Sequence, residues 1–317
     1  MTTIVKAAPP RPAVPQGKPP RRPGRHLPYT LLLPAATILA LVLGYPLVRL
    51  VVISGQDYGL RALFTGTATW LGAGNYTAVL RDPELVPVLV RTAGFCAALV
   101  AGTLAIGMAV ALLLGTLGRR MRTAVTVCLV AAWAVPNVAA TLIWQWLFQP
   151  TYGVVNWLLS RLRVFGDFSQ HDWLAHPLSA FTLVWLLVVW QSVPFVALTL
   201  RAGLSQIPRS YYEAAALDGA GGWARFRVIT LPFLRPILLL VAILSVIWDF
   251  NVFNQIWILT GGGPGGATTT LGIWSFTEAF TSQSYGRGAA IAVISVVLLM
   301  CLTAYYVRRL VRSGEEL

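Results

Sequence analysis

Four polar side chains interrupt an apolar segment in the last third of the chain. Asp249, Asn251, Asn254 and Gln255 all lie within the sequence WDFNVFNQIW. In a helix, which turns by about 100° per residue, the two asparagines and the glutamine share one face and the aspartate lies nearly opposite. Polar groups at bilayer depth are costly and usually functional, so the segment predicts a ligand pathway. Both faces can line one pathway only if the helix unwinds; alternatively, the three amides bond to a neighbouring helix.

Two further groups of polar residues lie beside prolines in apolar runs. A proline leaves a backbone carbonyl without its helical donor, which exposes polar backbone next to these side chains. The groups are Trp190, Gln191 and Ser192 before Pro194, and Asn137, Thr141, Trp144 and Gln145 after Pro136. The second group recurs at roughly helical spacing and can share one face. Both groups are further polar sites at bilayer depth, where polar side chains are costly and usually functional.

A third polar stretch, residues 211–236, reads YYEAAALDGAGGWARFRVITLPFLRP. Ser210 and Glu213 have the spacing of a capping box, which predicts a helix that begins there. Gly219 is placed for the left-handed residue that ends a helix, and a second amphipathic helix is expected over residues 223–231, ended by a proline. Two short helices outside the bilayer favour a docking surface; the alternative is a loop that only lies on the lipid.

The composition indicates that these groups sit in a membrane protein. The 317-residue chain is 56% hydrophobic and 11% charged, whereas soluble domains carry about 25% charged residues. A spanning helix needs about 20 mostly apolar residues. Six segments meet this requirement, at residues 29–54, 92–117, 124–148, 178–200, 237–259 and 289–307. The sequence therefore predicts an all-α membrane protein with six transmembrane helices.

The two ends of the chain are expected to lie outside the six-helix domain, which covers residues 29–310. Residues 1–28 are rich in proline and arginine and contain no acidic residue, so we expect a disordered basic tail. Residues 311–317 form a short second tail. The apolar run 29–54 is too long for the core of a signal peptide and is expected to remain as a membrane helix.

The 24 lysines and arginines are distributed unevenly between the loops. Most lie in the N-terminal tail, after the second span, after the fourth span, or at the C-terminus. The remaining loops carry Arg61, Arg81, Arg161, Arg163 and Arg287. By the positive-inside rule, both termini and the segment after the fourth span, about 202–236, are predicted to be cytoplasmic. The net charge of +13 is thus a topology signal, and we do not expect nucleic-acid binding.

The residues that most enzymes and metal sites require are scarce. The three cysteines, Cys96, Cys128 and Cys301, lie in apolar runs, and there are three histidines. Neither a disulfide framework nor a metal site is expected from them. The chain has no GxxxxGK[ST] phosphate-binding loop. We therefore expect a transport or binding protein that is not an enzyme, with no cofactor of its own.

The stretch after the fourth span resembles the EAA loop of bacterial ABC-importer permeases. The motif is Glu-Ala-Ala, three residues, Gly, nine residues and Ile-x-Leu-Pro, and every spacing is kept here. The matching residues are Glu213, Ala214, Ala215, Asp218, Gly219, Ile229, Leu231 and Pro232. The chain is most similar to the carbohydrate-uptake branch and to its maltose-permease-like member. The sequences LGAGNY before the second span and LTGGGP after the fifth span carry this wider similarity.

The resemblance implies a type I ABC-importer permease fold in the bacterial cell membrane. The EAA loop would be a coupling helix seated in a cleft of a separate ATP-hydrolysing subunit, so ATP would be bound only by that partner. The implied partners are a second homologous permease, two ATP-binding subunits and an extracytoplasmic solute-binding protein.

The resemblance also implies that the substrate is a sugar, expected to be a di- or oligosaccharide. Alignment with maltose-type relatives places a sugar-contacting position at Asp249, whose carboxylate can accept two hydroxyls, and Trp248 or Phe253 can stack on the sugar. The candidate pathway residues are Asp249, Asn251, Trp190, Gln191, Ser192, Asn137 and Gln145. The alternatives are an EAA-type permease for a non-sugar solute, or an ion-coupled secondary transporter, which usually shows internal repeats.

Overall fold

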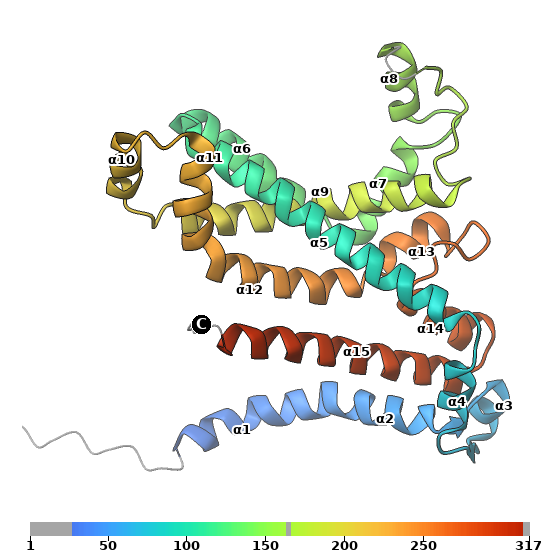
Figure 1. Cartoon of the computed structure of the whole chain (residues 1–317). Helices are drawn as coiled ribbons and strands as arrows, with labels where there is room; N and C mark the ends of the chain where they lie inside the picture. Colours follow the sequence, from blue (N-terminus) through green and yellow to red (C-terminus); the bar gives the residue numbers. More distant parts are fainter. Residues whose placement is uncertain (1–26, 163–165, 313–317) are drawn as a thin grey trace, which may run out of the picture. The chain divides into compact units, whose positions relative to one another are not determined.

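The computed structural model describes residues 27–162 and 166–312 (Figure 1). The chain divides into two compact units, Met1–Arg49 and Leu50–Leu317, and each is described by itself. In the first unit, α1 (Leu27–Leu39) and a π-helical turn η1 (Ala40–Gly44) lead into α2 (Tyr45–Ser54), which continues into the second unit. Most of the two expected tails, residues 1–26 and 313–317, lie outside the described residues.

The second unit consists of helices, with one two-stranded antiparallel ribbon, β1 (Gln56–Asp57) with β2 (Thr69–Trp70). Its helices are α3 (Leu60–Thr65), α4 (Gly74–Leu80), α5 (Leu85–Thr116), α6 (Arg119–Trp133), α7 (Asn137–Leu147), α8 (Val154–Leu162), α9 (Pro177–Leu204), α10 (Arg209–Leu217), α11 (Gly222–Arg225), η2 (Phe226–Thr230), α12 (Leu231–Phe250), α13 (Asn254–Thr260), α14 (Leu271–Phe276), η3 (Thr277–Thr281) and α15 (Tyr285–Arg312).

Five helices in the described residues are long and apolar enough to cross a membrane, and a bent pair makes a sixth span when counted as one. The expected all-α membrane protein with six spans is confirmed on this count. The second span begins at Leu85, earlier than the expected residue 92, and the sixth runs from Tyr285 to Arg312. Both helices extend past the apolar window from which their bounds were predicted, because a helix can continue beyond the hydrocarbon layer.

The sequence predicted one unbroken third span over residues 124–148, and this prediction is wrong. α6 and α7 meet at an angle of 99°. Pro136 adopts an extended conformation, with φ −58° and ψ 138°, and a proline also disfavours helical conformation in the residue before it. By contrast, Pro194 lies inside α9 without ending it.

The prediction of a separate short helix over residues 223–231 is also wrong, because the helix does not end at Pro232. Gly222–Phe250 is one span, made of α11, η2 and α12. The wide turn η2 directly precedes α12, whose second residue is Pro232. Leu231 donates its N–H to the carbonyl of Phe226, five residues back. Such π-turns take up an irregularity within a helix, so the missing N–H of Pro232 does not end it.

α5 packs most extensively against α9, and this pair forms the centre of the second unit. Leu99, Leu183 and Leu187 are buried in the core between them. Gly102 and Gly107 of α5 face Trp185 and Val196 of α9, and neither glycine has room for a Cβ atom. Small residues allow membrane helices to approach closely, which is the main route to tight packing when lipid surrounds the helices.

Figure 1 shows that α10, α11, the start of α6 and the last turns of α15 gather at one end of the second unit. We call this the α10 end. The opposite end, called the α13 end, carries α3, α4, α13 and α14. There Arg287 of α15 pairs with Asp82 and with Glu278 of η3, which ties the start of the last span to the segment before α5.

Candidate functional site

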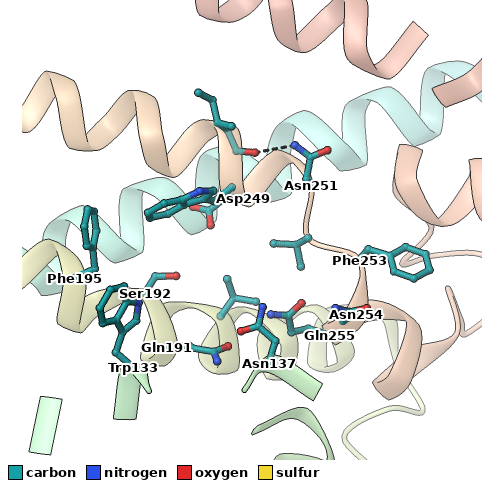
Figure 2. Close-up of a pocket in the computed structure, with 14 residues that line it drawn as sticks. Trp133, Asn137, Gln191, Ser192, Phe195, Asp249, Asn251, Phe253, Asn254 and Gln255 are labelled. Carbon is teal, nitrogen blue, oxygen red and sulfur yellow. Dashed lines mark hydrogen bonds between the residues drawn. The ribbon is translucent and has the colours of Figure 1, made fainter. Parts of the chain in front are cut away.

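A cavity of about 520 Å³ lies where α12 ends, between this helix, α6, α7, α9 and α13. Polar side chains from α7, α9, α12 and α13 surround it (Figure 2). The residues that line it are Trp133, Asn137, Val188, Gln191, Ser192, Phe195, Ile247, Trp248, Asp249, Asn251, Val252, Phe253, Asn254 and Gln255. Its volume lies within the range of about 300–1,000 Å³ that is typical of small-molecule sites.

A break in the fifth span brings the two predicted faces together. α12 ends at Phe250 and α13 begins at Asn254, so the residues between them leave the helix. As a result Asp249 and Gln255, which an unbroken helix would place on opposite faces, line the same cavity. The helix is therefore unwound at this point, which is the condition under which both faces can line one pathway.

Asp249 is the acidic residue of this cavity. It is only 5% exposed, and its Oδ2 atom is buried with no hydrogen-bond partner among the described residues. A buried carboxylate oxygen without a partner carries a desolvation cost, which a donor from a bound ligand would remove. Figure 2 shows the carboxyl group directed into the space toward Gln191.

Two amides of the cavity also hold its walls in place. Gln191 donates its Nε2 proton to the carbonyl of Val135 at 3.0 Å, next to the proline at which α6 and α7 separate. Asn251 donates its Nδ2 proton to the carbonyl of Ile247 at 2.8 Å, so part of its amide serves the end of α12. The carbonyl oxygens of both amides remain able to accept hydrogen bonds.

An aromatic wall closes one side of the cavity. The Trp133 and Phe195 rings lie 6.0 Å apart, and those of Phe195 and Trp248 lie 5.2 Å apart. Sequence reasoning missed Trp133 and Phe195. Each lies close to a proline within a predicted span, Pro136 or Pro194, and this proximity was the signal that could have found them. Phe253, a predicted stacking residue, lines the cavity, but its ring also contacts Phe276 at 5.1 Å.

Two predicted pathway residues lie elsewhere. Trp190 and Gln145 are not among the described residues that line the cavity. The ring of Trp190 packs against Trp144 with centroids 5.9 Å apart. Their contact with a substrate remains a prediction, whereas Asn137, Gln191, Ser192, Asp249 and Asn251 are brought together around one space.

The EAA segment forms a helix and a tight stop. α10 begins at Arg209 after Pro208, and no side chain caps it, so the predicted capping box is wrong. Pro208 stands at the N-cap and offers no side-chain acceptor, but its fixed φ of −61° suits the turn into a helix. At the other end, Gly219 has φ +75°, as the sequence predicted. Its N–H bonds to Ala216 O at 3.1 Å, and Ala220 N–H to Ala215 O at 2.9 Å, the Schellman pattern.

α10 is attached to the spanning helix that follows it. The Tyr212 hydroxyl lies 2.9 Å from the Thr230 hydroxyl, and the Tyr211 ring lies 5.2 Å from that of Phe233. Ile229 is buried beneath. The outward side exposes Glu213, Ala214, Asp218 and Gly219, together with Leu217, which is 90% exposed; Ala215 is half-buried, and Leu231 and Pro232 are exposed on α12.

The sequence of the chain shows which protein family it belongs to. Residues 101–314 match the family described as the inner membrane component of binding-protein-dependent transport systems. This stretch contains the cavity residues and the EAA segment. The chain is a member of this family.

The permease is similar over almost its full length to three named relatives. It is 45% identical to the diacetylchitobiose uptake system permease protein of Streptomyces coelicolor, over 93% of this chain and 90% of the relative. It is 38% identical to a sulfoquinovosyl glycerol transport system permease protein of Agrobacterium fabrum (90% of each chain). It is 35% identical to a trehalose/maltose transport system permease protein of Thermococcus litoralis (88% and 92%).

Its fold matches that of a solved importer. A crystal structure of a bacterial ABC transporter involved in import of the acidic polysaccharide alginate contains a chain that matches with a TM-score of 0.75 and 18% identity. The match covers 90% of the permease and 95% of that chain. The predicted ABC-importer permease fold is therefore confirmed.

Proposed function

We propose that this permease conducts a di- or oligosaccharide across the bacterial cell membrane, and that the cavity at the end of α12 holds the sugar during passage. The observation that carries the proposal is the partnerless, buried Oδ2 of Asp249, which faces a cavity lined by amides. A sugar presents many hydroxyl groups, each able to donate to a carboxylate and to exchange hydrogen bonds with amides.

The aromatic wall supports a sugar over an ionic or amino-acid substrate. A pyranose ring has an apolar face, and Trp248 is half exposed on the side of the cavity, so that a sugar can lie against it while its hydroxyls reach Asp249. Sites for small molecules combine such apolar walls with a few placed polar groups. The relatives at 45%, 38% and 35% identity bear names that refer to carbohydrates or their glycosides.

We further propose that the EAA segment, about residues 202–236, couples this passage to ATP hydrolysis by separate subunits. Leu217 at 90% exposure, with Glu213 and Asp218 beside it, gives α10 a surface suited to a protein cleft. Because Tyr212 bonds to Thr230 of the spanning helix, a movement of α10 would reach α12 and hence Asp249. ATP would be bound only by the partner subunits.

The assembly we propose contains this permease, a second homologous permease, two ATP-binding subunits and an extracytoplasmic solute-binding protein that delivers the sugar. It is tested by co-expression of the neighbouring genes and purification through a tag on this chain. A stable homodimer that transports sugar without a second permease would contradict this composition.

The substrate class is tested in proteoliposomes that contain the whole transporter and its binding protein. Uptake of radiolabelled N,N′-diacetylchitobiose, trehalose and maltose is measured with and without ATP inside. ATP-dependent uptake of at least one sugar, competed by the unlabelled sugar and not by amino acids or short peptides, is the expected result. Competition by amino acids or peptides alone would assign the permease to a non-sugar solute.

A further inference from the structure

Arg91 occupies an unusual position for a basic residue. It lies on α5, near the end of the span that the proposed topology places outside the cytoplasm, where the positive-inside rule disfavours lysine and arginine. Its side chain is only 23% exposed. A guanidinium group carries five N–H donors and needs acceptors when it is withdrawn from water. The acceptors of the Arg91 guanidinium therefore indicate which interactions hold this basic side chain at that position.

Those acceptors belong mainly to the loop between α13 and α14. Arg91 donates from Nη1 to the carbonyl oxygens of Gly266 at 2.7 Å and Thr269 at 3.2 Å. Its Nη2 pairs with Glu84 of its own segment at 3.5 Å. The next residue, Thr92, accepts the N–H of Leu271 at 2.9 Å. Two consecutive residues of α5 thus bond to the second half of this loop and to the first residue of α14.

The loop, Gly261–Thr270, is rich in glycine and is held both by its own hydrogen bonds, such as Thr268 N–H to Gly262 O at 3.0 Å, and by the contacts from α5. Gly261, Gly262, Gly265 and Gly266 all have positive φ, and glycine loses more conformational freedom on ordering than any other residue. Within the loop, Thr268 donates to the carbonyl of Gly263 at 2.6 Å. The Thr268 hydroxyl also lies 2.8 Å from that of Thr260, the last residue of α13.

These bonds form a continuous path from α5 to the cavity. Arg91 holds the loop, the loop is bonded to the end of α13 through Thr268, and α13 is a helix of only seven residues that begins with Asn254 and Gln255. Both of these residues line the cavity. Because α12 ends at Phe250, α13 is not held by a continuous helix on that side.

We propose that Arg91 is a positioning residue for the transport site: by fixing the glycine-rich loop, it fixes α13 and so sets where Asn254 and Gln255 stand in the cavity. The role of these amides as sugar contacts rests on the proposed function. The placement of α13 by Arg91 does not, and it can be measured without any sugar.

The first experiment follows the position of α13 by thiol labelling. The whole transporter, with its partner subunits, is placed in lipid nanodiscs, and Cys96, Cys128 and Cys301 are replaced by alanine. Asn254→Cys then reports on α13, and Ser192→Cys reports on the α9 wall of the same cavity. The rate of reaction with a small methanethiosulfonate reagent is measured for each reporter, with and without Arg91→Gln.

Arg91→Gln is expected to change the labelling rate of the Asn254→Cys reporter by about tenfold, the factor that one lost hydrogen bond from a charged donor produces in an equilibrium. The rate of the Ser192→Cys reporter should stay unchanged. Arg91→Lys, which keeps a charged donor, should restore part of the original rate. Glu84→Gln is the matched control, since it removes the ion pair and leaves the bonds to the loop carbonyls.

Two results would overturn the proposal. Unchanged labelling rates of both reporters in Arg91→Gln would show that α13 does not move. Equal changes in both rates would show a general loosening of the cavity. Uptake of radiolabelled N,N′-diacetylchitobiose is measured in parallel, and we expect Arg91→Gln to lower it while the amount of assembled transporter stays the same. If no sugar is transported by the unmodified complex, the proposed function fails, but the labelling comparison still decides the role of Arg91.

Discussion

At the scale of single residues, Asp249 is the group whose replacement separates sugar passage from coupling. Asp249→Ala removes a buried acceptor, and each hydrogen bond from a sugar hydroxyl to a carboxylate contributes about 1.5–3 kcal/mol. We therefore expect uptake to fall by at least about tenfold. ATP hydrolysis stimulated by the binding protein should largely survive, because α10 is untouched. Both are measured on one proteoliposome preparation.

Asn251→Ala is the matched comparison for this change. Its Nδ2 atom already donates a hydrogen bond to the carbonyl of Ile247, whereas Oδ2 of Asp249 has no hydrogen-bond partner among the described residues. Asn251 therefore has less hydrogen-bonding capacity left for a ligand. A milder loss of uptake is expected. If Asn251→Ala, or an alanine at Asn254 or Gln255, reduces uptake more than Asp249→Ala does, the sugar binds the other wall of the cavity.

Gly219 offers a second prediction at this scale. With φ +75°, a larger residue there costs about 1–2 kcal/mol of backbone strain, enough to displace α10 without unfolding the membrane helices. Gly219→Leu should leave the chain in the membrane but release or uncouple the ATPase, with transport lost. Co-purification of the ATPase and sugar uptake are the measurements.

Gly221→Ala is the control for this prediction. Gly221 has φ −67°, which any residue can adopt, and a Cβ there meets nothing within 4 Å. A Cβ at Gly219 also meets open space in this chain, so the two positions differ in backbone conformation and not in crowding. Gly221→Ala should retain both the ATPase and transport. A Gly219→Leu complex that keeps its ATPase and transports normally would reduce the segment to a surface loop.

At the scale of elements, the close approach of α5 and α9 depends on glycines. Gly102 and Gly107 have no room for a side chain against Trp185 and Val196, whereas Gly94 of the same helix faces open space. Overpacking a core costs about 1–3 kcal/mol. Gly107→Val should therefore lower the thermal stability of the purified complex, and Gly94→Val should not. Equal melting temperatures for the two variants would show that the helices can move apart at little cost.

At the same scale, the site exists because helices are interrupted. The break between α6 and α7, and the one between α12 and α13, put the ends of four helices beside one cavity. Irregular backbone at membrane depth is tolerated where it lines such a space, because a ligand or water can serve the freed polar groups. An unbroken helix would satisfy its own backbone and would leave no reason for a polar site there.

At the scale of the whole molecule, the orientation in the membrane is a proposal that labelling can test. Leu217 of α10 is 90% exposed and Phe64 of α3 is 82% exposed, and Figure 1 places α10 and α3 at opposite ends of the second unit. Single cysteines introduced as Leu217→Cys and Phe64→Cys, in a chain whose native cysteines are replaced, are treated with a membrane-impermeant maleimide. The chain is expressed without the ATP-binding subunits, so that α10 is not covered. We expect Phe64→Cys to react in intact spheroplasts and Leu217→Cys only in inside-out vesicles.

The sequence by itself determined the class of the protein, the approximate spans and the EAA segment. These depend on composition, on runs of apolar residues and on fixed local spacing, which the neighbours in the chain already specify. Gly219 is an example, because a helix that ends at a glycine takes its left-handed residue from the local sequence.

The tertiary structure alone decided which polar residues share a cavity. Helical periodicity placed Asp249 opposite Gln255, and only the break at residues 251–253 brought them together, since a broken helix no longer keeps one angular register. Trp133 and Phe195 join the site because separate helices meet there. The bonds from Arg91 to Gly266 and Thr269 span well over a hundred residues of sequence. Contacts of this kind depend on how helices pack, which no local pattern encodes.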